Sequence, residues 1–246
     1  EVAGPVWTEV TGNSTYNWTA PHARLSSAAS WSAAGDDVYV SSDHAETQAT
    51  AITITFPGTD ASPNRCVSVN RAGSTPPVGT DVLSGASITT TGNSKIIWGA
   101  CSAYIYGIIH NCATGSTSTN IQFNGNSLIL KFDACAFNLI ATGTAGLINM
   151  ANSAAGGVIW NNCTASFAAT GQGILNSGGM FEWRNFPDSV AVTGATIPTN
   201  LFKADATIGP KIILDGLDLS ASGSGKTLVA ATASASKISG CKLGSS

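Results

Sequence analysis

The chain has 246 residues and a formal net charge of −3, and only 10 % of its residues are charged whereas 43 % are hydrophobic. This balance argues against disorder, which combines low hydrophobicity with high charge, and it leaves no basic field for nucleic acid. No apolar run approaches the 18 residues that suggest a transmembrane helix, so we predict neither a membrane nor a nucleic-acid partner. Abundant small residues and short apolar runs favour an all-β protein with many tight corners.

Residues 1–50 are predicted to form an N-terminal cap and an entry strand. Thr19 offers a possible helix N-cap and Pro21 fits a first turn, so a short helix is expected up to about Ser32. Three tryptophans are expected to cover an open apolar end of the fold: Trp7, Trp18 and Trp31.

A resemblance enters after this short helix, in the stretch Gly-Asp-Asp-Val-Tyr-Val at residues 35–40. A short helix followed by Gly-Asp-x-apolar-x-apolar resembles the entry into right-handed parallel β-helices of the pectate-lyase kind. The longer stretch 35–47 resembles the N-terminal part of uncharacterised virion proteins of tailed phages. The match covers about a dozen residues, and it implies a β-helix and a structural role in a phage particle.

Residues 51–246 are predicted to form the body of the fold. Ile52–Phe56 and Cys66–Val69 alternate between apolar and polar residues, as strands with one buried face do. The segment 71–85 contains Gly73, Pro76, Pro77 and Gly79, and it is therefore predicted to be an excursion outside the core.

From Ile96 the sequence is periodic. Short apolar runs start at positions separated by 25, 26, 27, 27 and 27 residues: Ile96, Ile121, Leu147, Ile174, Leu201 and Leu228. A motif of large apolar, polar, small or Asn, and apolar residues follows each run and ends at a key inward residue: Cys112, Cys135, Cys163, Phe186, Leu217 and Cys241. A period of this length indicates a solenoid.

Three short strands and three corners fill this period, whereas a helical repeat would need longer amphipathic stretches. We therefore predict an all-β, single-stranded right-handed parallel β-helix of about six or seven coils. Stacking predicts a column of Phe132, Trp160 and Trp183 beside a column of Cys112, Cys135 and Cys163. Asn residues are expected at the corners: Asn111, Asn162 and Asn185. The six cysteines are expected to be free thiols, with the corner members buried.

The corner position two residues before each key residue supplies the candidate site. It holds His110, Asp133, Asn161, Arg184, Asp215 and Ser239. Stacking predicts Arg184 beside Asp215 and His110 near Asp133, either as an enzymatic groove or as cross-coil pairing on a solvated edge. Asp133 and Asp215 would lie three coils apart, roughly 14 Å, which is too far for a pair of glycosidase carboxylates. We therefore predict no catalytic residue.

Metal and cofactor sites are not predicted either. The acidic group Asp188, Asp205, Asp215 and Asp218 lacks the ligand series of a calcium loop. Residues 220–227 resemble a phosphate-binding loop, but Ser220 replaces its first Gly and a strand is expected after it. The three histidines have no metal-ligand spacing: His22, His44 and His110.

The sequence thus favours a structural protein of a tailed-phage particle, most specifically a head decoration or cement protein on the virion surface, with capsid or other virion proteins as partners. A homotrimer is expected by analogy with phage β-helices, and the end of the solenoid beyond Cys241 is expected either to fray or to be covered by a partner subunit. Two alternatives stay open. One is a tail-associated, tailspike-like protein that binds or degrades a host-surface glycan, and the other is a secreted β-helix adhesin.

Overall fold

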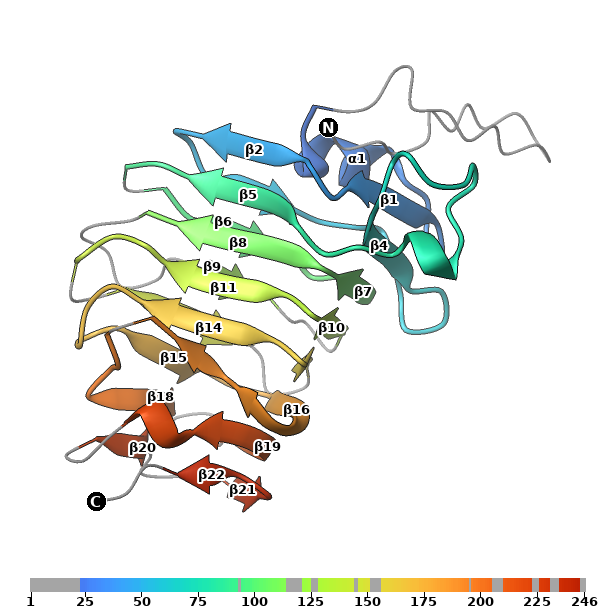
Figure 1. Ribbon diagram of the computed structural model, residues 1–246. Coiled ribbons are helices and arrows are strands. Elements are labelled where there is room, and N and C mark those ends of the chain that lie inside the picture. Colours follow the sequence, from blue (N-terminus) through green and yellow to red (C-terminus); the bar gives the residue numbers. More distant parts are fainter. Residues whose placement is uncertain are drawn as a thin grey trace.

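The protein is a right-handed parallel β-helix (Figure 1). The structure, a computed structural model, describes residues 23–92, 94–113, 121–124, 128–143, 146–150, 156–194, 196–204, 210–222, 226–230 and 235–243. In Figure 1 the chain runs from top to bottom, and the strands on the near side, such as β5 (Ala86–Thr90), β8 (Ile108–Cys112) and β11 (Ala136–Leu139), all point to the left. A chain that winds in this sense is right-handed. The predicted fold class is confirmed.

Three parallel sheets form the walls of the solenoid. The first sheet contains β1 (Asp37–Ser41), β4 (Asn64–Val69), β7 (Ala103–Tyr106), β10 (Ile129–Asp133), β13 (Gly157–Asn161), β16 (Met180–Val190), β19 (Lys211–Leu219), β21 (Ala235–Ser239) and β22 (Lys242–Leu243). The second contains β2 (Ala45–Gln48), β5 (Ala86–Thr90), β8 (Ile108–Cys112), β11 (Ala136–Leu139), β14 (Thr164–Phe167) and β17 (Val192–Thr193). The third contains β3 (Ile52–Ile54), β6 (Ile96–Trp98), β9 (Ile121–Phe123), β12 (Leu147–Met150), β15 (Gly173–Asn176), β18 (Asn200–Ala204) and β20 (Thr227–Ala230).

The chain visits the three sheets in turn and completes about six turns between β1 and β19. The sequence period is the length of one turn, because Ile96 pairs with Ile121 and Ile148 pairs with Ile174 on adjacent strands. The strands β1 and β2, which fall inside the predicted 1–50 segment, already belong to the stack.

Large aromatic side chains fill the interior of the solenoid. Phe132, Trp160 and Trp183 occupy one register position on β10, β13 and β16, as predicted. The Trp160 and Trp183 ring centroids are 5.0 Å apart at 78°, and Phe137 stacks on Trp160 at 4.1 Å and 2°. Phe132, Trp160 and Trp183 are fully buried. They contribute much of the stability of the fold, because each aromatic side chain removes a large apolar area from water.

A residue with left-handed backbone marks the corner between the first and second sheets. It has a φ of 50° at Ala134 and 51° at Asn162, and a glycine takes this role at Gly107. Gly216, inside β19, and Gly240, between β21 and β22, have the same backbone conformation at the corresponding point of later coils. The next residue turns inward in each case: Ile108, Cys135, Cys163, Leu217 and Cys241. Cys135 and Cys163 lie at the predicted place, and Cys241 does so while only half-buried.

Two predicted corner residues are wrong. Cys112 ends strand β8 and pairs with Leu139, so it does not continue the column of Cys135 and Cys163, and Asn111 lies on the same strand. Phe186 is 69 % exposed, because the register of β16 against β19 shifts between Arg184 and Ser189. The extra residues of this bulge turn Phe186 out of the core.

The N-terminal end of the stack is covered by the predicted short helix, α1 (Leu25–Trp31), which packs on β1 and β3. Leu25, Ala28 and Ala29 are its buried residues. Trp31 is 80 % exposed, so the prediction that it covers the apolar end is wrong. The helix has Arg24 at its N-cap position, so the prediction of Thr19 as the N-cap is wrong. Trp7, Trp18 and Thr19 lie outside the described residues. Within the described part, no helix is long and apolar enough to cross a membrane.

The segment 70–85 leaves the stack between β4 and β5, as predicted, and contains the short 3-10 helix η1 (Gly79–Asp81). Its ends are held together by an antiparallel bridge between Val69 and Val82. The Asp81 carboxylate accepts hydrogen bonds from the backbone N–H groups of Ser74 and Val78, both at 2.9 Å. A second 3-10 helix, η2 (Ser220–Ser222), follows β19.

Candidate functional site

The predicted row of corner side chains exists over five strands. Asp133, Asn161, Arg184, Asp215 and Ser239 are successive register partners on β10, β13, β16, β19 and β21. Arg184 therefore lies beside Asp215, as predicted, but its guanidinium contacts the Glu182 carboxylate on its own strand. The Ser239 hydroxyl donates to Asp215 Oδ1 at 2.8 Å. The row is a set of neighbouring polar pairs along the solenoid.

His110 is not part of this row. It lies inside the core on β8, where its ring stacks on Phe137 at 4.5 Å and its Nδ1 lies 3.1 Å from the carbonyl oxygen of Ala136. Burial lowers the pKa of His110 to about 4, so the ring is neutral at neutral pH. The residue beside Asp133 is Tyr106, because the corner lies at Gly107 and not next to Cys112. The predicted proximity of His110 and Asp133 is wrong.

The acidic neighbourhood near β19 is held by local hydrogen bonds. Asp218 is buried, and its carboxylate accepts the Ser220 backbone N–H at 2.9 Å and the Lys242 Nζ at 3.3 Å. The hydrogen bonds from Ser220, and then the contact with Lys242, lower the pKa of Asp218. Asp205 and the Asp188 side chain lie outside the described part. No group of three or more His, Cys, Asp or Glu side chains in that part could hold a metal ion.

The segment that resembles a phosphate-binding loop leads into a strand. Thr227–Ala230 forms β20, as predicted, whereas a phosphate loop must open a helix. The Lys226 Nζ donates to the Ile197 carbonyl oxygen at 3.1 Å. Residues 223–225 lie outside the described residues.

All six cysteines are free, and five of them are buried: Cys66, Cys101, Cys112, Cys135 and Cys163. Burial raises the pKa of Cys66, Cys101 and Cys163, which disfavours the reactive thiolate form. The prediction of free thiols is confirmed, and these three act as small apolar core residues.

A buried carboxylate that the sequence did not point to joins α1 to the stack. Glu46 on β2 accepts the backbone N–H of Leu25 at 2.9 Å, and its Oε2 lies 3.6 Å from His44 Nε2. Burial alone would raise the pKa of Glu46, but the contacts with His44, the Leu25 N–H and Gln48 outweigh this and lower it. This arrangement anchors the helix and is structural.

The outer face of the second sheet bears a ladder of uncharged polar side chains. The Asn111 amide donates to Thr89 Oγ1 at 3.3 Å, and the Asn138 amide donates to Asn111 Oδ1 at 2.9 Å. The Ser166 hydroxyl then donates to Asn138 Oδ1 at 2.7 Å. Asn111 and Asn138 lie within β8 and β11, so this ladder runs along a sheet face and not along a corner.

The outer face of the first sheet bears a group that sequence reasoning missed. Two register rows cross β1, β4, β7 and β10: Asp37, Arg65, Tyr104 and Lys131 in one, and Tyr39, Val67, Tyr106 and Asp133 in the other. We call the face formed by these eight positions the tyrosine face; Val67 is buried, and the other seven residues are at least partly exposed. The alternation Tyr104-Ile105-Tyr106 was the available signal, because it places both tyrosines on the side opposite the buried Ile105.

Polar contacts order this face. The Tyr104 hydroxyl donates to Asp133 Oδ2 at 3.3 Å, and the Tyr39 hydroxyl donates to Asp37 Oδ2 at 3.4 Å. The Arg65 guanidinium lies 3.4 Å from the same Asp37 oxygen. Partial burial, together with the Asp133 carboxylate, raises the pKa of Tyr104 to about 12, so it stays a neutral donor.

Comparison of the chain with protein-family models, with curated proteins and with solved structures finds no match. A functional proposal therefore rests on the residues of the chain and on how the fold arranges them.

Proposed function

We propose that the chain is a structural protein of a tailed-phage particle and decorates the outer surface of the head. The observation that supports this role best is the outer face of the second sheet. Its outward positions on β2, β5, β8, β11, β14 and β17 hold no charged residue: Ala45, Thr47, Ser87, Thr89, Ile109, Asn111, Ala136, Asn138, Thr164, Ser166 and Thr193.

Such a face suits contact with another protein. Binding there removes no charge from water, and the polar atoms of the ladder between Thr89 and Ser166 already bond to one another. A rigid sheet also loses little conformational freedom on binding. The proposal includes capsid proteins as partners and a homotrimer, the latter by analogy with phage β-helices.

The proposal assigns no catalytic residue. Asp133 and Asp215, the two carboxylates of the corner row, are separated by the intervening strands β13 and β16. Each already has a polar partner, Tyr104 for Asp133 and Ser239 for Asp215.

Electron microscopy of phage particles purified from cells that produce the tagged chain tests this role. We expect density for the β-helix at repeated positions on the outer surface of the head. Asn138→Lys places a charge in the middle of the face and should lower the occupancy of the chain on particles at least about tenfold. Gln122→Lys, at an outward position of the third sheet, is the control and should bind normally. Location on the tail, or absence from the particle, would refute the proposal.

A further inference from the structure

The tyrosine face concentrates the tyrosines of the described chain. Tyr39, Tyr104 and Tyr106 all lie on it, within the three neighbouring strands β1, β4 and β7. Tyr104 and Tyr106 are alternate residues of β7 and point to the same side of the sheet. Tyr39 shares the row of Tyr106 two strands away, roughly 10 Å at the usual strand spacing.

Charged side chains surround these rings in balanced numbers. Arg65 and Lys131 flank Tyr104 on the adjacent strands of its row, and Asp37 and Asp133 provide two carboxylates. Two positive and two negative groups give the face no net charge. A polyanion such as single-stranded nucleic acid would meet both carboxylates there, and binding of such strands depends on a continuous positive groove.

Two polar groups on this face are open to a ligand. The Tyr106 hydroxyl and the Lys131 ammonium have no hydrogen-bond partner among the described residues. Lys131 is exposed, and Tyr106 is partly exposed. The face thus combines aromatic rings, two hydrogen-bond donors without partners and two carboxylate acceptors. This combination matches a ligand that offers apolar C–H faces and many hydroxyl groups.

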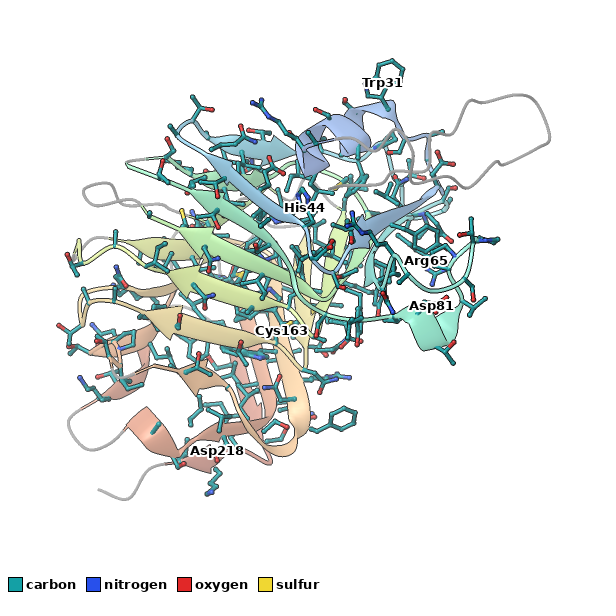
Figure 2. All side chains as sticks on the ribbon, turned by 45° about the horizontal axis from the view of Figure 1, so that its top comes forward. Trp31, His44, Arg65, Asp81, Cys163 and Asp218 are labelled. Carbon is teal, nitrogen blue, oxygen red and sulfur yellow. The ribbon has the colours of Figure 1, made fainter. Side chains whose placement is uncertain are left out.

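The segment 70–85 bounds one end of the face. Its last residues lie against the corner that follows Tyr106, because the Gly85 N–H donates to the Gly107 carbonyl oxygen at 3.1 Å. Figure 2 places Asp81 of this segment on the same side of the molecule as Arg65. The segment also exposes apolar side chains at Val78, Val82 and Leu83. The segment therefore lies next to the end of the face that contains Tyr106.

From these features we propose that the tyrosine face binds a neutral oligosaccharide whose pyranose rings lie on Tyr104 and Tyr106. The carboxylates of Asp37 and Asp133 accept its hydroxyl groups, and Lys131 and the Tyr106 hydroxyl donate to its oxygens. Tyr39, in the row of Tyr106, provides a third aromatic ring farther along the solenoid axis. The ligand is thus an oligosaccharide and not a single sugar. This activity does not depend on where the chain sits in a particle.

An array of neutral oligosaccharides, acidic oligosaccharides and single-stranded oligonucleotides tests the proposal, followed by calorimetric titration with the strongest neutral binder. We expect binding to neutral members, and Tyr104→Ala and Tyr106→Ala should each weaken it about tenfold. Phe186→Ala removes an exposed aromatic ring outside the face and should bind like the unchanged protein.

Circular dichroism melting of each variant separates loss of binding from loss of folding. Tyr106→Phe keeps the ring and removes the unpaired hydroxyl, so it should fold normally and bind with an intermediate loss. The proposal is overturned if no neutral oligosaccharide binds. It is also overturned if oligonucleotides or acidic sugars bind more tightly, or if Phe186→Ala weakens binding as much as Tyr106→Ala.

Discussion

Ala134 holds a backbone conformation that residues with a side chain rarely adopt. Its φ of 50° lies in the left-handed region, and it shares this region with Asn162, Gly107, Gly216 and Gly240 at the equivalent corners. Asn tolerates the conformation and Gly adopts it without steric strain, whereas Ala has neither property. Ala134 is therefore the least favourable of the five corner residues.

Ala134→Gly should raise the free energy of unfolding by about 0.5–1 kcal/mol, because removal of the Cβ relieves the left-handed strain. Chemical denaturation measures the change. The control is Ala136→Gly, two residues later in β11, where Gly should lower the free energy of unfolding by a similar amount because it weakens a strand. Equal destabilisation by both substitutions would contradict this account of the corner.

The same residues show what the sequence could predict at this scale. Cys135, Cys163, Leu217 and Cys241 were assigned correctly, because a short polar or small residue precedes each of them. Cys112 follows an Asn as Cys163 does, but the left-handed residue of its coil is Gly107. Sequence spacing alone did not distinguish Cys112 from Cys163. The inward corner residue of this coil is Ile108, four residues before Cys112, so His110 was misplaced as well.

At the scale of elements, the attachment of α1 depends on one buried carboxylate. Glu46 is 5 % exposed and accepts the Leu25 N–H at the start of the helix. His44, which also contacts this carboxylate, is buried as well (Figure 2). Glu46→Ala leaves a buried N–H without a partner and should lower the free energy of unfolding by about 1–3 kcal/mol.

The attachment should also depend on pH. The pKa of Glu46 is lowered in the folded state, so its contribution is complete above the pKa of the unfolded chain and is lost as pH falls through the folded pKa. Hydrogen exchange of the α1 amides, measured from neutral pH down to about pH 3, should show the helix opening at the acid end. Glu46→Gln should remove most of this pH dependence. A helix that opens equally in both proteins would refute the role of Glu46.

The elements themselves differed in how well the sequence predicted them. The alternating runs near Ile52, Cys66 and Ile96 identified strands, and the short helix ended near Ser32 as expected. The bulge in β16 was not predicted, because Trp183-Arg184-Asn185-Phe186 fits the corner motif and only the register with β19 turns Phe186 outward. The tyrosine face was not predicted, because Tyr39 and Tyr106 are far apart in the sequence and share a row only through the pairing of β1, β4 and β7.

For the whole molecule, each coil is stabilised chiefly by its two neighbours, as in other solenoids. Trp183 fills the core between Trp160 and the coil of β19, and its Nε1 donates to the Cys163 carbonyl oxygen at 3.2 Å. Phe186, only three residues away, is exposed. The two residues form a matched pair of large aromatic side chains with opposite environments.

Trp183→Ala should lower the free energy of unfolding by about 3–5 kcal/mol, because it leaves a large cavity in the core. Phe186→Ala should change it by less than about 0.5 kcal/mol. Hydrogen exchange of the Trp183→Ala protein should show the largest loss of protection in β13, β16 and β19 and little change in β1 and β4. A uniform loss along the chain would show that the solenoid unfolds as one unit.

The way in which the segment 70–85 is attached determines which insertions the β-helix tolerates. Its two ends meet at a corner, joined by the Val69–Val82 bridge and tied to the next coil through Gly85 and Gly107, while the strands above and below pair without it. The peptide between these anchors can vary in length and composition without altering the pitch of the coil, since loop length has only a weak effect on closure. The same corner could therefore display an inserted foreign peptide on a rigid rod.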